Sequence, residues 1–166
     1  QSLVKLARAA ARYGNGEIDL TRRANLQIRG LDTPGVEAMQ ELLGELGLLD
    51  ASAEAESIRN ILVGPLAGFE SSELIDVRPV AHALERLLSE EARLWALPPK
   101  FGFLIDGGGA LSLDGERADI RLRAIDRVTF ALGVDTQDGI EWLGGVPASE
   151  AAAAAARAAV IFASSS

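Results

Sequence analysis

The sequence predicts an α+β fold in two modules: an incomplete ferredoxin-like (βαββαβ) module, followed by a mixed α/β sheet domain. Three observations predict it. Over the first fifty residues, apolar positions recur with the periods of a helix, two strands and a second helix. From Ser57 onward, a buried strand and a long helix precede five strand-like runs and a last helix. The 166 residues, 48% of them hydrophobic, suffice for one ordinary domain or two small ones with a real core.

The first module begins with a helix over residues 2–13, whose stripe at helical spacing is Leu3, Leu6, Ala10 and Tyr13. Short alternating runs at 17–20 and 26–29 predict two strands. A second helix is expected to begin at Thr33, with a buried stripe of Val36, Met39, Leu42, Leu43 and Leu46. One more strand at each end would complete a βαββαβ unit, so we expect the first strand to lie before Gln1.

The second module begins with an apolar strand at 58–63 and a turn at 64–68. A helix over about 72–96 follows, with Pro79 as a possible early kink. Five β-like runs come next, at 101–105, 110–113, 120–124, 128–133 and 140–143. An alanine-rich helix over 149–162 ends the series.

These elements predict a domain over residues 1–52 and a second domain over 57–163. The chain carries 24 acidic and 16 basic residues, a formal charge of −8, which argues against a nucleic-acid partner. It has no apolar run long enough for a membrane span and no secretory signal, so we expect a cytoplasmic protein. The absent initiator methionine suggests a piece of something longer.

Cysteine is absent and His82 is the one histidine. A disulfide framework, a cysteine-ligated zinc or iron–sulfur site and a thiol nucleophile are therefore excluded for this chain by itself, and we expect no metal ligands in it. His82 lies among apolar helical residues and is interpreted as a packed or surface side chain.

Basic residues gather at the start of the chain: residues 1–30 hold six basic and two acidic side chains, whereas 31–92 hold three basic and thirteen acidic ones. A cationic island in an acidic protein suits a discrete anionic ligand better than a polyanion. Fourteen of the sixteen basic residues are arginine, which binds carboxylates and oxyanions bidentately. A GC-rich genome would also explain that bias.

Adjacent Arg22 and Arg23 lie in the short connection between the first two predicted strands, where an extended chain would point them to opposite faces. They form either a ligand-facing pair or a solvated loop. Arg59 begins an otherwise apolar strand and needs a partner there, which is either a protein carboxylate or an anionic ligand.

Lys100 follows Pro98 and Pro99 and precedes an apolar strand, so it lies at a strand mouth or simply on the surface. Asp106 and three following glycines resemble a phosphate-binding loop. A strand rather than a helix is expected after them, so the glycines are interpreted as a hairpin turn, with close ligand approach as the alternative.

Three segments, in their order along the chain, resemble the nitrite/sulfite reductase family. They are Leu-Thr-Arg-Arg-Ala-Asn-Leu-Gln at 20–27, Arg-Asn-Ile-Leu at 59–62 and Leu-Pro-Pro-Lys-Phe at 97–101. The resemblance implies a tetrapyrrole-binding oxidoreductase in which Arg23, Arg59 and Lys100 face the bound anion. Arg22, Arg29 and Asp106 are second-rank candidates for cofactor binding.

One departure distinguishes groups within that family. Sulfite reductases carry a second lysine two residues after the first, where this chain has Gly102. Gly102 and the glycines at 14–16 and 107–109 are most similar to the precorrin-3B synthase group. That resemblance implies oxygen-dependent hydroxylation of precorrin-3A, with lactone formation, in cobalamin biosynthesis.

The resemblance also implies an internal repeat and a [4Fe-4S] cluster held by cysteines of the second half. We therefore expect this chain to cover the first half, to bind no cluster and to be inactive alone, with the C-terminal half and the tetrapyrrole as partners. Two alternatives stay open. One is a siroheme-dependent sulfite or nitrite reductase, and the other is a non-catalytic binding or assembly module whose arginines pair with protein carboxylates.

Overall fold

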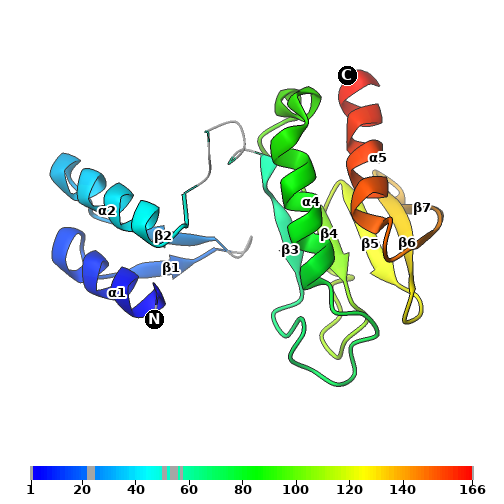
Figure 1. Cartoon of the computed structure of the whole chain (residues 1–166), viewed down its shortest axis with the longest axis horizontal. Helices are drawn as coiled ribbons and strands as arrows, with labels where there is room; N and C mark the ends of the chain where they lie inside the picture. Colours follow the sequence, from blue (N-terminus) through cyan, green and yellow to red (C-terminus); the bar gives the residue numbers. More distant parts are fainter. Residues whose placement is uncertain (1, 22–24, 50–51, 53–55, 57, 166) are drawn as a thin grey trace. The chain divides into compact units, whose positions relative to one another are not determined.

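The structure is a computed structural model that describes residues 2–21, 25–49, 52, 56 and 58–165, with the side chain of Ser165 excepted. The chain divides into two compact units, Gln1–Ala51 and Ser52–Ser166. Both units combine helices with a β-sheet, which confirms the predicted α+β class (Figure 1).

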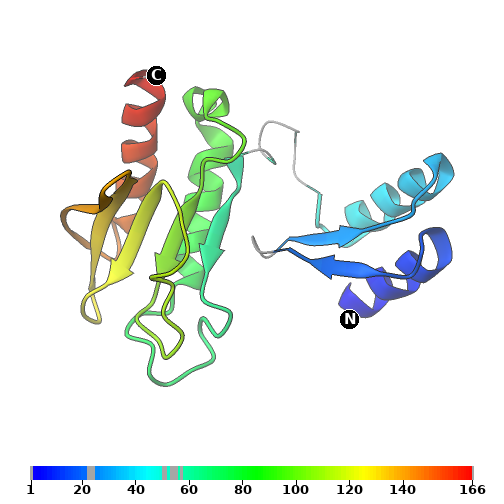
Figure 2. The same ribbon diagram turned by 180° about the vertical axis from the view of Figure 1, so that it is seen from behind.

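In the first unit, two helices pack on one face of a two-stranded antiparallel ribbon (Figures 1 and 2). The helices are α1 (Ser2–Tyr13) and α2 (Thr33–Glu45), and the strands are β1 (Ile18–Leu20) and β2 (Leu26–Ile28). The small core is centred on Leu6, Ala9 and Met39. These elements confirm the predicted helix–strand–strand–helix order.

Helix α2 begins as the sequence predicts, but one residue of its expected stripe lies outside the core. The Asp32 carboxylate accepts a hydrogen bond from the Gly35 amide at 2.8 Å and so caps the helix, with Pro34 in the first turn. Met39 is 4% exposed, whereas Val36 is 41% exposed, so its predicted burial was wrong. Gly35, in the same first turn, is the buried residue, so Val36 lies on the exposed side of the helix.

The second unit is built on a five-stranded mixed sheet in the order β3-β4-β5-β6-β7. Its first three strands, β3 (Ile61–Val63), β4 (Phe103–Asp106) and β5 (Ile120–Ala124), are parallel. The last two, β6 (Thr129–Thr136) and β7 (Gly139–Pro147), add an antiparallel hairpin. The amino ends of β3, β4 and β5 therefore share one edge of the sheet, and their carboxyl ends share the other.

Two helices, α4 (Arg78–Glu90) and α5 (Ala151–Ser165), cover one face of this sheet (Figures 1 and 2). Between the helices and the sheet lies the main core, whose fully buried residues include Leu84, Leu88, Phe103, Ile105, Leu122 and Phe130. Alanines on α5, among them the fully buried Ala151, Ala155 and Ala159, let that helix approach the sheet closely.

Two predicted boundaries in this unit were wrong for local reasons. The strand expected over 58–63 begins at Ile61, so Arg59 precedes it by two residues. The helix expected over 72–96 begins at Arg78 and is followed by a short 3-10 helix, η1 (Ala92–Ala96). Pro79 lies in the first turn of α4, where its missing N–H costs no hydrogen bond, so it starts the helix instead of kinking it.

The strand expected over 110–113 is absent, and with it the hairpin turn assigned to the glycines at 107–109. Residues 107–119 form an irregular connection, because the chain must return from the carboxyl end of β4 to the amino end of its parallel neighbour β5. Leu113 is nevertheless buried, since it packs with Leu62, Leu104 and Ala118 on the face opposite the helices.

A buried ion pair holds that connection and the strand pair β5–β6 together. Arg121 is 4% exposed, and its guanidinium donates through Nε to Oδ1 of Asp135, through Nη2 to Oδ2 of Asp135 at 3.0 Å, and to the main-chain oxygen of Glu116. Burial alone would raise the pKa of Asp135, but the hydrogen bonds from Arg121 and the Ala118 amide lower it below its ordinary value.

We predict that Asp135→Asn destabilises the second unit by about 3 kcal/mol, because it leaves Arg121 buried without its charge partner. The stabilising effect of Asp135 is complete above its unfolded-state pKa of about 4 and is lost as the pH falls through the lower folded-state value. Thermal unfolding between pH 7 and pH 3 measures both effects. A variant with unchanged stability and an unchanged slope on the acid side would contradict this role.

Candidate functional site

Two of the three leading site candidates lie at the same edge of the second unit's sheet. Arg59 precedes β3 and Lys100 precedes β4, and these strands are parallel neighbours in which Ile61 pairs with Phe103. Asn60 connects the two segments, because its side-chain Nδ2 donates to the main-chain oxygens of Pro99 at 3.0 Å and Phe101 at 3.2 Å. The structure therefore brings the Arg59 and Lys100 segments side by side.

Lys100 occupies a tight turn. The Phe101 amide donates to the main-chain oxygen of Pro98 at 2.8 Å, which closes four residues with Pro99 and Lys100 at the centre. Proline favours the second position of such a turn because its φ is already set. The Lys100 side chain is exposed, so its ammonium can meet a ligand from solvent.

Arg59 lies beside α4, where Glu85 is one of its partners. Its Nη1 donates to Oε1 of Glu85 at 3.3 Å, and Oε2 of the same carboxylate lies 3.5 Å from Nδ1 of His82. The side chains of Arg59 and Glu85 are 42% and 38% exposed, so this pair contributes little to stability and opens readily. Arg59 was expected to enter an apolar strand, but it stands outside the strand and remains accessible.

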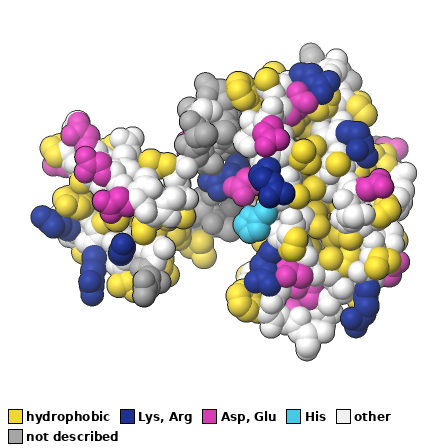
Figure 3. Space-filling view, viewed as in Figure 1, with side chains coloured by type: hydrophobic (Ala, Val, Ile, Leu, Met, Phe, Trp, Pro, Cys, Tyr) yellow, Lys and Arg dark blue, Asp and Glu magenta, His cyan; other side chains and the backbone are white. Residues whose placement is uncertain are grey.

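His82 is a surface residue. Its side chain is 76% exposed on α4, and Figure 3 shows it (cyan) next to acidic and basic side chains. Glu85 had no signal in the sequence that marked it as a partner of Arg59, because the contact joins residues 26 positions apart.

In the first unit, Arg22 and Arg23 lie outside the described residues. Arg29 directly follows β2, and its Nε donates to Oδ2 of Asp19, while its Nη2 donates to Oε1 of Gln27 at 3.2 Å. The hydrogen bond from Arg29 to Asp19 raises the pKa of the guanidinium above its ordinary value. Ile18 and Ile28 face the helices, so Asp19 and Gln27 lie on the opposite face of the ribbon.

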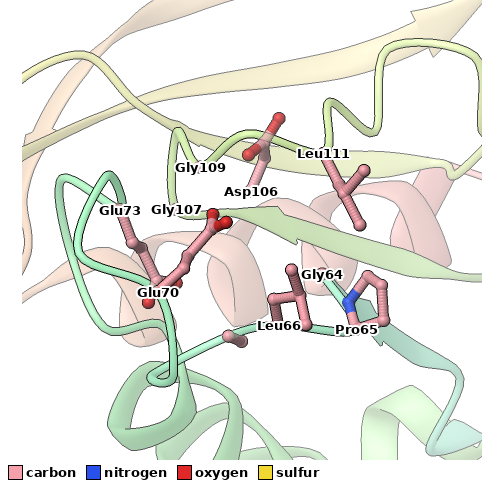
Figure 4. Close-up of a pocket in the computed structure, with 10 residues that line it drawn as sticks. Gly64, Pro65, Leu66, Glu70, Glu73, Asp106, Gly107, Gly109 and Leu111 are labelled. Atoms are coloured by element: carbon pink, nitrogen blue, oxygen red, sulfur yellow. The ribbon is translucent and has the colours of Figure 1, made fainter.

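Asp106 lies apart from Arg59 and Lys100. It is the last residue of β4 and 8% exposed, so it belongs to the carboxyl edge of the sheet, whereas Lys100 precedes the amino end of the same strand. Asp106 lines a hollow together with Glu70, Glu73 and the glycine loop (Figure 4).

The carboxylates of this hollow hold loops together. Glu70 accepts a hydrogen bond from the Ala110 amide at 2.8 Å, Glu73 accepts one from Gly68 at 2.6 Å, and Asp106 accepts one from Gly108 at 2.8 Å. Figure 4 shows the Glu70 side chain reaching from the loop after β3 toward the glycine loop. These carboxylates already accept hydrogen bonds from the loop amides, and their charge would repel a phosphate. The glycine loop therefore resembles a phosphate-binding loop in sequence but does not suit a phosphate in structure.

Gly107 is required by close approach. A Cβ atom there would lie 2.6 Å from the main-chain oxygen of Ile75 and 2.3 Å from Oε1 of Glu73.

In the described part of the chain, no group of three or more histidine, cysteine, aspartate or glutamate side chains is arranged to hold a metal ion.

Comparison with known proteins identifies the family. Residues 1–46 match the nitrite/sulfite reductase ferredoxin-like half domain, and residues 54–155 match the nitrite and sulphite reductase 4Fe-4S domain. The chain belongs to the nitrite/sulfite reductase family. It contains no cysteine, so it supplies no thiolate ligand to a cluster.

Two similar relatives show how much of a family member is present. A precorrin-3B synthase from Sinorhizobium sp is 40% identical over 126 residues, which is 76% of this chain and 26% of the relative. A ferredoxin–nitrite reductase from Synechococcus elongatus is 35% identical over 125 residues, which is 72% of this chain and 24% of the relative. The chain thus spans about a quarter of the length of these relatives.

The fold has a counterpart among solved structures. The Mycobacterium tuberculosis NirA protein aligns with a TM-score of 0.78 and 20% identity, over 97% of this chain and 31% of NirA. This likeness confirms the predicted fold.

Among the helices that the structure describes, none has the length and apolar character of a membrane span.

We predict that Gly107→Ala destabilises the second unit by more than about 1 kcal/mol, because the added methyl group meets the Ile75 main chain. Gly115→Ala is the matched control, since a Cβ atom at Gly115 meets nothing within 4 Å. Urea unfolding of both variants measures the difference. Equal stability of the two variants would show that the glycine loop is not closely packed.

Proposed function

We propose that this chain is the amino-terminal part of a precorrin-3B synthase-like oxidoreductase. The activity proposed is oxygen-dependent hydroxylation of precorrin-3A, with lactone formation, in cobalamin biosynthesis. Arg23, Arg59 and Lys100 would face the carboxylates of the substrate, with Arg22 and Arg29 in secondary positions. The chain alone would be inactive.

The observation that carries this proposal is the shared position of Arg59 and Lys100 at the amino edge of parallel strands. Both side chains are exposed there. A precorrin is fringed with carboxylates, which a guanidinium binds bidentately and an ammonium binds as a point charge. The 40% identity to a precorrin-3B synthase supports the same choice.

Gly102 supports the choice of a precorrin over sulfite. A Cβ atom at this position would meet nothing closer than the main-chain oxygen of Asn60 at 3.7 Å, an ordinary contact distance. The backbone therefore accepts a side chain there, and packing does not explain why the second lysine of sulfite reductases is missing. A glycine two residues after Lys100 would leave more room for a bulky substrate than a lysine there.

The family's cofactors place different demands on this chain. A [4Fe-4S] cluster would take its thiolates from the C-terminal half, because cysteine is absent here. Such a cluster supplies electron transfer when bound. Among the residues that the structure describes, Arg59 and Lys100 would suit a tetrapyrrole, because their charges complement its carboxylates.

A siroheme-dependent nitrite or sulfite reductase is the second candidate. The relatives named as nitrite reductases, such as the one from Synechococcus elongatus, favour it. Binding of siroheme and of precorrin-3A to the protein that contains this chain distinguishes the two candidates. Retention of siroheme together with nitrite or sulfite reduction would replace the precorrin proposal.

A non-catalytic module is the third candidate. It is favoured by the carboxylates that already pair with two of the arginines, Glu85 with Arg59 and Asp19 with Arg29. Both pairs are exposed, so an anionic ligand can displace the carboxylates at little cost.

We predict that Arg23→Ala, Arg59→Ala and Lys100→Ala each weaken precorrin-3A binding by about 1–3 kcal/mol, the scale of a lost charged hydrogen bond. Titration of the protein that contains this chain measures the change. Lys5→Ala and Arg127→Ala are the controls, because both side chains are exposed and outside the proposed site. Unchanged binding in all three test variants would exclude the proposed substrate contacts.

We predict that Glu85→Gln strengthens precorrin-3A binding by a few-fold, because Arg59 no longer has to leave the Glu85 carboxylate; exposed pairs are worth about 0.2–1 kcal/mol. The same titration tests it. Glu90→Gln on the same helix is the matched control. Weaker binding by Glu85→Gln would mean that Glu85 helps to position Arg59 and does not compete for it.

A further inference from the structure

The Asn60 side chain holds both main-chain carbonyls that flank Lys100. Its Nδ2 lies 3.0 Å from the oxygen of Pro99 and 3.2 Å from that of Phe101, while its own main-chain oxygen accepts from the Phe103 amide at 2.8 Å. An amide nitrogen has two hydrogens to donate, and both neighbours are acceptors. The nitrogen, and not the oxygen, must therefore face the turn.

Asp119 holds the other end of the same turn. Its Oδ2 accepts from the Gly102 amide at 2.7 Å, and the Asp119 and Ile120 amides donate to the Gly102 oxygen at 2.9 and 3.2 Å. Asp119 directly precedes β5 and is half-buried. Both main-chain groups of Gly102 are thus fixed by the neighbouring strand.

Residues 98–102 are therefore held from β3 on one side and from β5 on the other. Two prolines limit their backbone further, and the bond from the Phe101 amide to Pro98 closes the turn. Within this fixed backbone, the exposed Lys100 side chain leads out to solvent. The hydrogen bonds thus fix the position of the Lys100 backbone, from which the flexible side chain extends.

We propose that Asn60 and Asp119 are positioning residues for Lys100: they clamp residues 98–102 so that its ammonium meets an anionic ligand at a fixed place. The clamp itself follows from the contacts above, whereas its use in ligand binding rests on the proposed function. Neither residue is proposed to touch the substrate.

The two lysines of the chain make the clamp directly measurable. Reductive methylation with ¹³C-formaldehyde labels Lys5 and Lys100 and keeps their charge, so Lys5 serves as an internal reference. Asn60→Asp keeps the shape of the side chain but presents carboxylate oxygens to two carbonyl oxygens, which repel them. In the NMR spectrum of the Asn60→Asp variant, the ¹³C-methyl signal of Lys100 should shift and sharpen, while that of Lys5 stays in place.

Gln137→Glu is the matched control, because it makes the same amide-to-acid change at an exposed turn of the same unit. Asp119→Ala should change the Lys100 signal as Asn60→Asp does, and Asp119→Asn, which keeps an acceptor for the Gly102 amide, should restore much of it. An unchanged Lys100 signal in both Asn60→Asp and Asp119→Ala overturns the proposal.

Amide exchange tests the clamp without any substitution, should the variants fail to fold. The Gly102 amide, bound to Asp119, should exchange slowly with solvent. Exchange at the rate of an unstructured peptide overturns the clamp.

Binding separates this inference from the proposed function. With precorrin-3A and the protein that contains this chain, Asn60→Asp should weaken binding up to about tenfold, and by less when Lys100 is already alanine. If Lys100→Ala weakens binding but Asn60→Asp does not, the positioning role is overturned and the proposed function stands. If Lys100→Ala leaves binding unchanged, the role of Lys100 in the proposed function is overturned, and the methyl signals decide the clamp by themselves.

Discussion

Parallel pairing of β3, β4 and β5 is the constraint on which the candidate site depends. In-register pairing of Ile61 with Phe103, and of Phe103 with Ile120, aligns the amino ends of the three strands. Residues that precede these strands then meet at one edge, although they lie some forty and twenty positions apart in the sequence. The same pairing sends Asp106 to the other edge, because it ends β4. The strand direction thus divides the polar residues into two sets with different environments.

Several of the many acidic residues have a structural role. Asp32 caps a helix, Glu70 and Glu73 tie the loop after β3, and Asp119 holds the turn before β4. In each case a carboxylate accepts a main-chain N–H that the loop or helix end leaves unpaired. Asp135 does the same for Ala118 and also neutralises the buried Arg121. Part of the negative charge therefore organises loops and helix ends, while Arg59 and Lys100 stay exposed at the amino edge of the sheet.

Membership of the nitrite/sulfite reductase family divides the chemistry between this chain and the remainder of such proteins. The chain spans about a quarter of the length of its relatives and contains no cysteine. It supplies no thiolate ligand, and under the proposed function its cationic groups would bind an anionic tetrapyrrole. Arg59 pairs with Glu85, and Arg29 pairs with Asp19, in ion pairs that are exposed to solvent.

The sequence by itself determined the elements whose signals are local. The helices α1 and α2 and the strands β1 and β2 were predicted, because apolar periodicity and the Thr-Pro start depend only on neighbouring residues. Arg59 and Lys100 could be singled out because a charge beside an apolar run is visible in the sequence. Tertiary structure alone decided that residues 107–119 return over a face of the sheet, that Pro79 begins a helix, and that Asn60 and Asp119 hold the Lys100 turn. These outcomes depend on strand direction and on contacts between distant segments, and neither leaves a periodic trace in the amino-acid order.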